Sequence, residues 1–288
     1  MNLRTDLAIE QREIGQRNAP EEIEQTVEKT DTGIKITQIT IKSKSAEDAL
    51  KRKRGKYITV ELPSFAATHL FDSAVETISS KLGSLLPPSG LILVAGLGNQ
   101  NITPDALGPA CASQIFSTRH IGKELQKSAG FESLRPVARI APGVLGQNGI
   151  ETGEIIAGII RQISPAALIT VDALASRRLS RLGCTVQICN SGITPGSGVG
   201  NARKEISEKT MGVPVISIGV PTVVDATTLA LDLVGEGAQE KIDKESEKMM
   251  VTPREIDLII ERAAKLISTA INRTLQPQIS AEEISEIL

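Results

Sequence analysis

The sequence predicts an α/β fold, a three-layer sandwich in which helices cover both faces of a mostly parallel central sheet. From Leu91 onward, short apolar runs typical of buried strands alternate with amphipathic segments typical of helices. Hydrophobic residues make up 40% of the 288 residues and aromatic residues only 2%, so we expect an aliphatic core. We expect one α/β domain over residues 7–288, with an N-terminal hairpin region at about 30–65 and a C-terminal helical region at about 240–288.

The N-terminal elements are predicted from alternation and charge. Met1–Gln16 is polar and is expected on the surface. Pro20–Lys29 is predicted to be a short helix, because proline and glutamate suit a first helical turn. Ile34–Ile41 alternates apolar and polar residues and is predicted to pair with Tyr57–Leu62 as an antiparallel hairpin. The basic run Lys51–Arg54 lies in the connection and is expected to face solvent.

The later elements follow one another as strand and helix. A helix is expected over Thr68–Leu86, before Pro87 and Pro88, and another amphipathic segment follows Asp105 to about Lys127. The predicted strands are Leu91–Ala95, Val137–Ala141, Ala167–Val171, Cys184–Cys189 and Val213–Val220. The further predicted helices are Glu151–Ile163, Pro221–Val234 and Ile256–Leu275.

The composition excludes several classes of function. The formal net charge is −2 and aromatic residues are few, so the sequence does not favour a nucleic-acid binder that stacks bases. Two histidines and three cysteines without ligand spacing argue against a zinc site, although carboxylates could still hold a metal. A dinucleotide fingerprint starting at Gly96 fails at Asn101. We therefore predict no bound metal and no cofactor, and the chain has no apolar run long enough to span a membrane.

The first candidate functional residue is Asp105. It follows the strand Leu91–Ala95 and the tight turn Gly96-Leu97-Gly98-Asn99. Ligands of open α/β sheets bind beyond the carboxyl ends of the strands, where this sequence pattern places Asp105. The alternative is that Asp105 only caps the helix that Thr103-Pro104 opens.

Two further acids follow predicted strands. Asp172 ends the strand Ala167–Val171, and Asp225 follows Val223-Val224 near the start of a helix. Carboxyl groups that face each other at the sheet edge can share a proton, so that one acts as an acid and the other as a base. Such a pair suits the activation of water for peptide hydrolysis. The alternative is that each acid caps the helix that follows it.

The segment Asn190–Asn201 carries four glycines and a proline and joins two predicted strands. A connection of this length without regular structure favours a functional loop. Gly196 and Gly198 could let backbone amides approach a ligand. A non-catalytic α/β module that binds a small ligand or an anion in this loop is therefore the alternative to an enzyme.

Several long blocks of the chain resemble the germination protease family of spore-forming bacteria. The blocks are RTDLAIE (Arg4–Glu10), GLGNQNITPDALGP (Gly96–Pro109), TRH (Thr118–His120), APGVLGQNGIET (Ala141–Thr152), VDALASR (Val171–Arg177), SGITPGSGVGNARKE (Ser191–Glu205) and GVPVISIGVPTVVDA (Gly212–Ala226). The resemblance implies a phosphorylase/hydrolase-like α/β fold, similar to that of hydrogenase maturation peptidases. By motif, it places the two proposed catalytic acids of the family on Asp105 and Asp172.

The resemblance also implies a substrate and an assembly. Members of the family start the degradation of small acid-soluble, DNA-binding spore proteins during germination, in the cytoplasm of the spore core. They form homotetramers, and no direct contact with nucleic acid or membrane is expected. The substrates are cut after an acidic residue, which calls for a cation near the cut bond. The predicted substrate-binding residues are Asn99, Arg119, Arg177, Gly196, Gly198 and Arg203.

The resemblance further implies synthesis as a zymogen. The chain carries an acidic, an apolar and an alanine residue in succession, Asp6-Leu7-Ala8, which is the pattern that the family cuts. We predict cleavage between Asp6 and Leu7, which removes residues 1–6 as a propeptide from a flexible terminus. If Asp6 rests against an arginine before the cut, acidification should favour its release.

Overall fold

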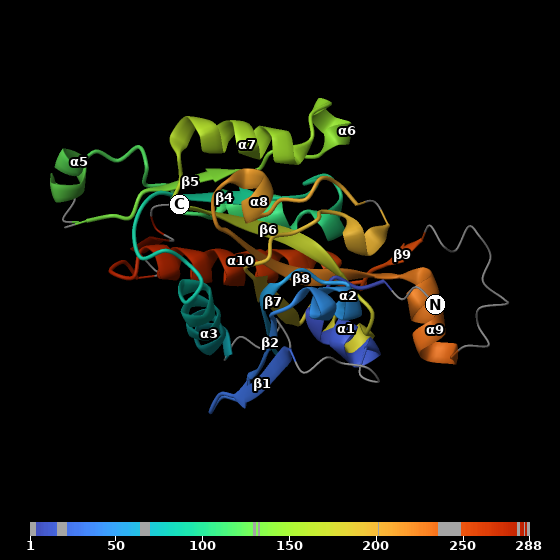
Figure 1. Ribbon diagram of the computed structural model, residues 1–288. Coiled ribbons are helices and arrows are strands. Elements are labelled where there is room, and N and C mark those ends of the chain that lie inside the picture. Colours follow the sequence, from blue (N-terminus) through green and yellow to red (C-terminus); the bar gives the residue numbers. More distant parts are fainter. Residues whose placement is uncertain are drawn as a thin grey trace.

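The computed structural model describes residues 4–15, 22–63, 70–128, 131, 133–200, 202–235, 249–280, 283–284 and 286. In this part of the chain, nine strands form one sheet in the order β1-β2-β3-β7-β8-β6-β4-β5, with β9 paired to β8 (Figure 1). The strands are β1 (Ile23–Lys29), β2 (Lys35–Ile41), β3 (Gly55–Glu61), β4 (Ile92–Gly96), β5 (Val137–Ile140), β6 (Ala167–Ser176), β7 (Thr185–Cys189), β8 (Val215–Asp225) and β9 (Met250–Val251).

The α/β class is confirmed, and the sheet has two halves. Strands β5, β4, β6 and β8 run parallel, as the alternation of strands and helices predicts. Strands β1, β2, β3 and β7 add an antiparallel half. The sheet is therefore mixed rather than mostly parallel, because the predicted hairpin β2–β3 joins the sheet edge through β7 and needs no crossover helix.

Helices cover both faces of the sheet. They are α1 (Ala8–Ile14), α2 (Lys44–Leu50), α3 (Phe71–Gly83), α4 (Leu107–Ser113), α5 (Lys123–Ser128), α6 (Leu145–Asn148), α7 (Thr152–Ile163), α8 (Glu208–Met211), α9 (Ala226–Val234) and α10 (Ile256–Leu275), with 3₁₀ turns η3 (Thr103–Asp105), η4 (Leu179–Arg181) and η5 (Ser197–Val199). Helices α3, α4 and α10 pack on one face, and α7 and α8 cover the parallel half of the other (Figure 1). On that second face, α1 and α2 cover the antiparallel half.

The site of interest lies on the second face, between these two groups of helices. Strand β6 contributes Leu168 to the apolar cluster under α7 and α8, and Leu174 to the cluster under α1 and α2. Asp172 lies between them in the strand, and alternate residues of a strand share one face. The sheet therefore presents Asp172 at the junction of two separate hydrophobic clusters.

Three predicted elements differ from the structure. Pro20–Lys29 is not a helix, because Ile23–Lys29 forms β1 and pairs residue by residue with β2; residues 16–21 lie outside the described residues. The segment after Asp105 is not continuous, because α4 ends at Ser113 and the N–H of Phe116 donates to the side chain of Asn272. Pro221 lies in β8 beside a register shift, a place where a strand tolerates proline, so α9 begins only at Ala226.

The N-terminal segment is docked rather than exposed, contrary to the surface prediction. Leu7 and Ala8 have no exposed area, and they pack with Leu50, Tyr57 and Leu174. Burying an aliphatic side chain of this kind stabilises a fold by about 1.5–3 kcal/mol. The first helix is therefore part of the hydrophobic core of the antiparallel half.

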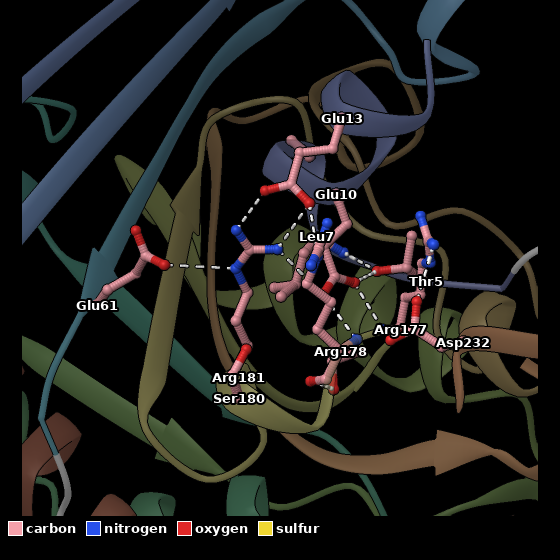
Figure 2. Close-up of polar contacts among 12 residues, drawn as sticks. Thr5, Leu7, Glu10, Glu13, Glu61, Arg177, Arg178, Ser180, Arg181 and Asp232 are labelled. Atoms are coloured by element: carbon pink, nitrogen blue, oxygen red, sulfur yellow. Dashed lines mark hydrogen bonds and ion pairs between the residues drawn. The ribbon is translucent and has the colours of Figure 1, made fainter. Parts of the chain in front are cut away.

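A buried carboxylate anchors α1 to the end of β6. Glu10 is fully buried and accepts backbone hydrogen bonds from Arg177 at 2.6 Å and from Arg178 at 3.0 Å (Figure 2). Its other contacts are the hydroxyl of Thr5 and the guanidinium of Arg181, the latter at 3.3 Å. Buried carboxylates need such partners, because an unpaired buried charge is strongly destabilising.

Arg181 joins three acidic side chains from separate parts of the chain. Its guanidinium contacts Glu10, Glu13 at 2.5 Å and Glu61 at 3.4 Å (Figure 2). Arg181 is itself buried, so these contacts are poorly screened by water. The network fixes α1, η4 and β3 relative to one another.

We predict that Arg181→Met lowers the free energy of unfolding by about 3–5 kcal/mol, because it leaves the buried carboxylate of Glu10 without its cation. Denaturant unfolding followed by circular dichroism measures the change. Arg161→Met, on the exposed side of α7, is the matched control and should change stability by less than about 0.5 kcal/mol. Equal stability of the Arg181 variant and the control would show that the network contributes little.

Candidate active site

Asp105 and Asp172 line one cavity of about 530 Å³. The cavity lies beyond the carboxyl end of β4. Gly96, the last residue of β4, pairs with Val171 of β6, so Asp172 is the first residue of β6 beyond the end of β4. The sequence predicts a strand that ends at Asp172, whereas β6 continues to Ser176 and contains Asp172. The structure therefore brings the two predicted acids together at the carboxyl edge of the parallel strands.

The glycine turn after β4 holds Asp105 in place. The N–H of Asn99 donates to Oδ2 of Asp105 at 2.8 Å. Gly98 has φ +110, and a Cβ at Gly98 would lie 2.1 Å from the carbonyl oxygen of Asp105. Only glycine allows this close approach. Ala106, not Asp105, is the N-cap residue of α4, so the helix-cap alternative does not explain Asp105.

The third acid, Asp225, has the structural role that the alternative gave it. Its Oδ1 accepts a hydrogen bond from the N–H of Thr228 at 2.9 Å and caps α9. Its Oδ2 lies 3.1 Å from the guanidinium of Arg4. Asp225 is therefore neutralised and is not part of the acid pair.

The surroundings of Asp172 favour its protonated form. Its side chain is only 5% exposed, and burial, the charge of Asp105 and the charge of Asp6 all raise its pKa well above the ordinary value. Burial also raises the pKa of Asp105, but the N–H of Asn99 opposes this effect. A proton shared by the pair is therefore favoured on Asp172 over Asp105.

Asp6 is the third carboxylate of the site. It lines the same cavity as Asp105 and Asp172. Its Oδ2 accepts from the N–H of Ala175 and its Oδ1 from the hydroxyl of Ser197, both at 2.9 Å. In the described part of the chain, an amide and a hydroxyl hold the carboxylate of Asp6, in place of the arginine that the sequence suggested.

The predicted substrate-binding residues separate into two groups. Asn99, Gly196 and Arg203 line the cavity, and the guanidinium of Arg203 lies 3.9 Å from a carboxylate oxygen of Glu151. Gly198 lies directly beneath Asp6, because a Cβ there would be 2.1 Å from Oδ2 of Asp6.

Arg119 and Arg177 do not line this cavity. Arg119 is exposed near the amino end of β5, where its N–H donates to the carbonyl of Val137. Arg177 forms an ion pair with Asp232 at 2.8 Å (Figure 2). Nearness to a motif in sequence did not place either arginine at the site, because Arg119 lies at the amino end of β5 and the side chain of Arg177 is paired with Asp232.

Sequence reasoning missed Gln187. Its Nε2 donates to the carbonyl oxygen of Asp6 at 3.0 Å, and its Oε1 accepts from the N–H of Ala8 at 2.7 Å. The signal was present, because Gln187 is a polar residue in the otherwise apolar strand pattern of β7. A buried polar side chain needs partners, and here the partners belong to the N-terminal segment.

The described residues contain no cluster of three or more His, Cys, Asp or Glu side chains that could hold a metal ion. None of the helices in this part of the chain has the length and apolar character needed to cross a membrane.

The fold and the site define the class of protein. An α/β sheet with two carboxyl groups in a shared cavity, one of which has a pKa raised well above its ordinary value, has the groups that a hydrolase uses to activate water by acid–base catalysis. Consistent with this class, a sequence model of the germination protease family, peptidase family A25, matches residues 4–236. The chain belongs to the germination protease family and is an endopeptidase, which rules out the non-catalytic alternative.

Curated relatives match along the whole chain. The germination protease of Clostridium perfringens strain SM101 is 42% identical over 325 residues, covering 100% of this chain and 99% of that protein. The germination protease of Clostridium tetani is 42% identical over 326 residues, with 100% of both chains covered. That of Bacillus cereus is 34% identical over 352 residues, covering 98% of this chain and 95% of that protein.

Among solved structures, the [NiFe] hydrogenase maturation protease HycI from Thermococcus kodakarensis is similar over 66% of this chain and 98% of its own. The identity is 18% and the TM-score is 0.38, values that support no argument about the site.

We predict that Asp172→Asn stabilises the protein at neutral pH. Because the folded state raises the pKa of Asp172, stability falls as the pH rises from the unfolded value of about 3.9 through the folded value, and the amide removes this loss. Each kcal/mol corresponds to about 2–4 °C for a chain of this size, so the melting temperature should rise by a few degrees at pH 7. The difference should vanish near pH 3. An equal melting temperature at pH 7 would contradict the assignment of the proton to Asp172.

Proposed function

We propose that this endopeptidase starts the degradation of small acid-soluble, DNA-binding spore proteins during germination, in the cytoplasm of the spore core, and cuts after an acidic residue. The observation that carries the proposal is the shared cavity of Asp105 and Asp172, in which the charge of Asp105 raises the pKa of Asp172. The family resemblance supports the substrate class. The aspartic-type chemistry needs no cofactor.

The two acids divide the work of hydrolysis. Asp105 takes a proton from water as the water oxygen attacks the carbonyl carbon, and Asp172 gives its proton to the carbonyl oxygen. When the tetrahedral intermediate collapses, Asp105 delivers its proton to the leaving nitrogen. Asp172 regains a proton from one of the two hydroxyl groups on the former carbonyl carbon. Both acids return to their starting states. The burial of Asp172 and the N–H of Asn99 on Asp105 support this order of protonation.

The cavity supplies contacts for an acidic substrate. Of the predicted arginines, Arg203 lines this cavity, and its guanidinium makes a long contact with Glu151. The side chain of Arg203 is partly exposed, so its charge attracts acidic peptides. Asn99 and Gly196 contact the peptide backbone. The same family resemblance supports a homotetramer, for which a mass of four 30.6 kDa chains in sedimentation equilibrium is the expected result.

The N-terminal residues form the propeptide. Self-cleavage between Asp6 and Leu7 removes residues 1–6 and activates the enzyme. The position of Asp6 in the catalytic cavity supports this proposal, because the uncut segment occupies space that a substrate needs. The buried Leu7 and Glu10 hold the remaining segment after the cut.

We predict that Asp105→Asn and Asp172→Asn each reduce peptidase activity on a small spore protein by at least about 100-fold, because acid and base act as a unit. Steady-state cleavage measured by gel or mass spectrometry gives the rates. Asp31→Asn, in an exposed turn, is the control and should keep the wild-type rate. Near-normal turnover by the Asp172 variant would remove Asp172 from the mechanism.

We predict that the wild-type chain loses residues 1–6 on incubation and that Asp105→Asn does not. Intact-mass spectrometry detects the loss of the hexapeptide. Loss in both proteins would mean that another protease makes the cut, and loss in neither would mean that the N-terminus is not a processing site.

A further inference from the structure

Every polar atom of Asp6 has a partner. Its N–H donates to the carbonyl of Ala175 at 2.8 Å, and its carboxylate accepts from the N–H of Ala175 and the hydroxyl of Ser197. Its carbonyl oxygen accepts from Nε2 of Gln187. Gly198 leaves room for the carboxylate, since any Cβ there would collide with Oδ2. The fold therefore contains a site fitted to an aspartate residue, both main chain and side chain.

This site distinguishes a carboxylate from an amide. Both side-chain oxygens of Asp6 act as acceptors, one from the N–H of Ala175 and one from Ser197. Asparagine has a single acceptor oxygen, so it can accept only one of these two hydrogen bonds, and the hydroxyl of Ser197 would have to turn and accept from its NH₂ group. Two hydrogen bonds to an ionised carboxylate are also stronger than bonds to a neutral amide. The selectivity for an acidic residue thus comes from an amide and a hydroxyl, without an arginine.

Gln187 holds the peptide on both sides of the Asp6–Leu7 bond. It donates to the carbonyl before that bond and accepts from the N–H of Ala8, the second residue after it. In the sheet, Gln187 of β7 and Asp172 of β6 both pair with Gly219 of β8. The two side chains therefore lie on the same face, separated by a residue that has no side chain.

A second cavity of about 430 Å³ continues the site on the other side of Asp6. Its lining includes Asp6, Gln187, Ser197 and Gly219. Asp6 also lines the 530 Å³ cavity that holds the two catalytic acids. Asp6 thus borders both cavities.

We propose that the site of Asp6 is the specificity pocket of the enzyme: Ser197 and the N–H of Ala175 bind the acidic side chain before the cut, and Gln187 binds the carbonyl of the bond that is cut. This inference rests on the proposed self-processing and extends it to substrates in trans, which occupy the pocket after residues 1–6 have left. The Nε2–H of Gln187 also stabilises negative charge on the carbonyl oxygen as water attacks.

The first test measures self-processing of the full chain. Gln187→Glu keeps the acceptor for Ala8 and removes only the donor to Asp6, so the rate should fall about 100-fold at neutral pH. The rate should partly recover at acid pH, where the introduced carboxyl group is protonated and donates again, which a purely structural role would not produce. Ser197→Ala should slow processing by about tenfold. The matched controls, exposed Gln25→Glu and Ser113→Ala, should process at the wild-type rate.

The second test measures selectivity in trans. Fully processed wild-type and Ser197→Ala enzymes are given the decapeptide NLRTDLAIEQ, which copies residues 2–11, and the same peptide with Asn in place of Asp. The ratio of kcat/KM for the two peptides should fall about tenfold in Ser197→Ala, at an unchanged melting temperature. A Ser197→Ala chain that keeps its melting temperature but does not process at all also supports the pocket.

The outcomes separate this inference from the proposed function. Processing by Asp105→Asn at the wild-type rate would overturn the proposed self-processing, and near-normal cleavage of a small spore protein by the same variant would overturn the proposed function. Processing lost in Asp105→Asn, but unchanged in rate and selectivity in Gln187→Glu and Ser197→Ala, would overturn the specificity pocket alone.

Discussion

The structure depends on the burial of a carboxyl group, Asp172, in the middle of a central strand. Burial alone disfavours its charge, and two further carboxylates, Asp105 and Asp6, face the same cavity. Such an arrangement persists only because the surrounding sheet is well packed, with apolar clusters on both sides of Asp172 along β6. Ionisation of Asp172 in this environment lowers the stability of the fold. The same environment favours the protonated carboxyl group that the proposed mechanism uses as an acid.

The N-terminal segment is held by the same kind of partner at two points. Glu10 and Asp6 are both acidic, and each accepts hydrogen bonds from backbone N–H groups near the end of β6. Backbone N–H groups of Ala175, Arg177 and Arg178, at the end of β6 and just after it, therefore donate to the N-terminal segment. Residues 5–10 are ordered by specific hydrogen bonds as well as by the apolar contacts of Leu7 and Ala8.

The sequence predicted the features that depend on local signals. The apolar runs of β4 and β6, the glycine turn at Gly98 and the acid that follows it are all local, and they led to Asp105 and Asp172. The features that depend on distant partners were missed. The glutamates of β1 suit a helix start and so predict a helix, whereas pairing with β2 determines the conformation of this segment. The contact of Gln187 with Asp6 joins residues 181 apart, and no local pattern reports it.

The bonds of Asp6 to Ala175 and Ser197 span 169 and 191 residues. During synthesis, the N-terminus leaves the ribosome first, but Asp6 has none of these hydrogen-bond partners until β6, β7 and the following loop have been made. At about 5–20 residues per second, this wait lasts roughly 10–40 s. The part of the chain that is made first therefore docks late. A nascent chain cannot assemble the pocket around Asp6 before most of the catalytic sheet has emerged, so translation itself delays the first moment at which the bond after Asp6 can be presented for cleavage.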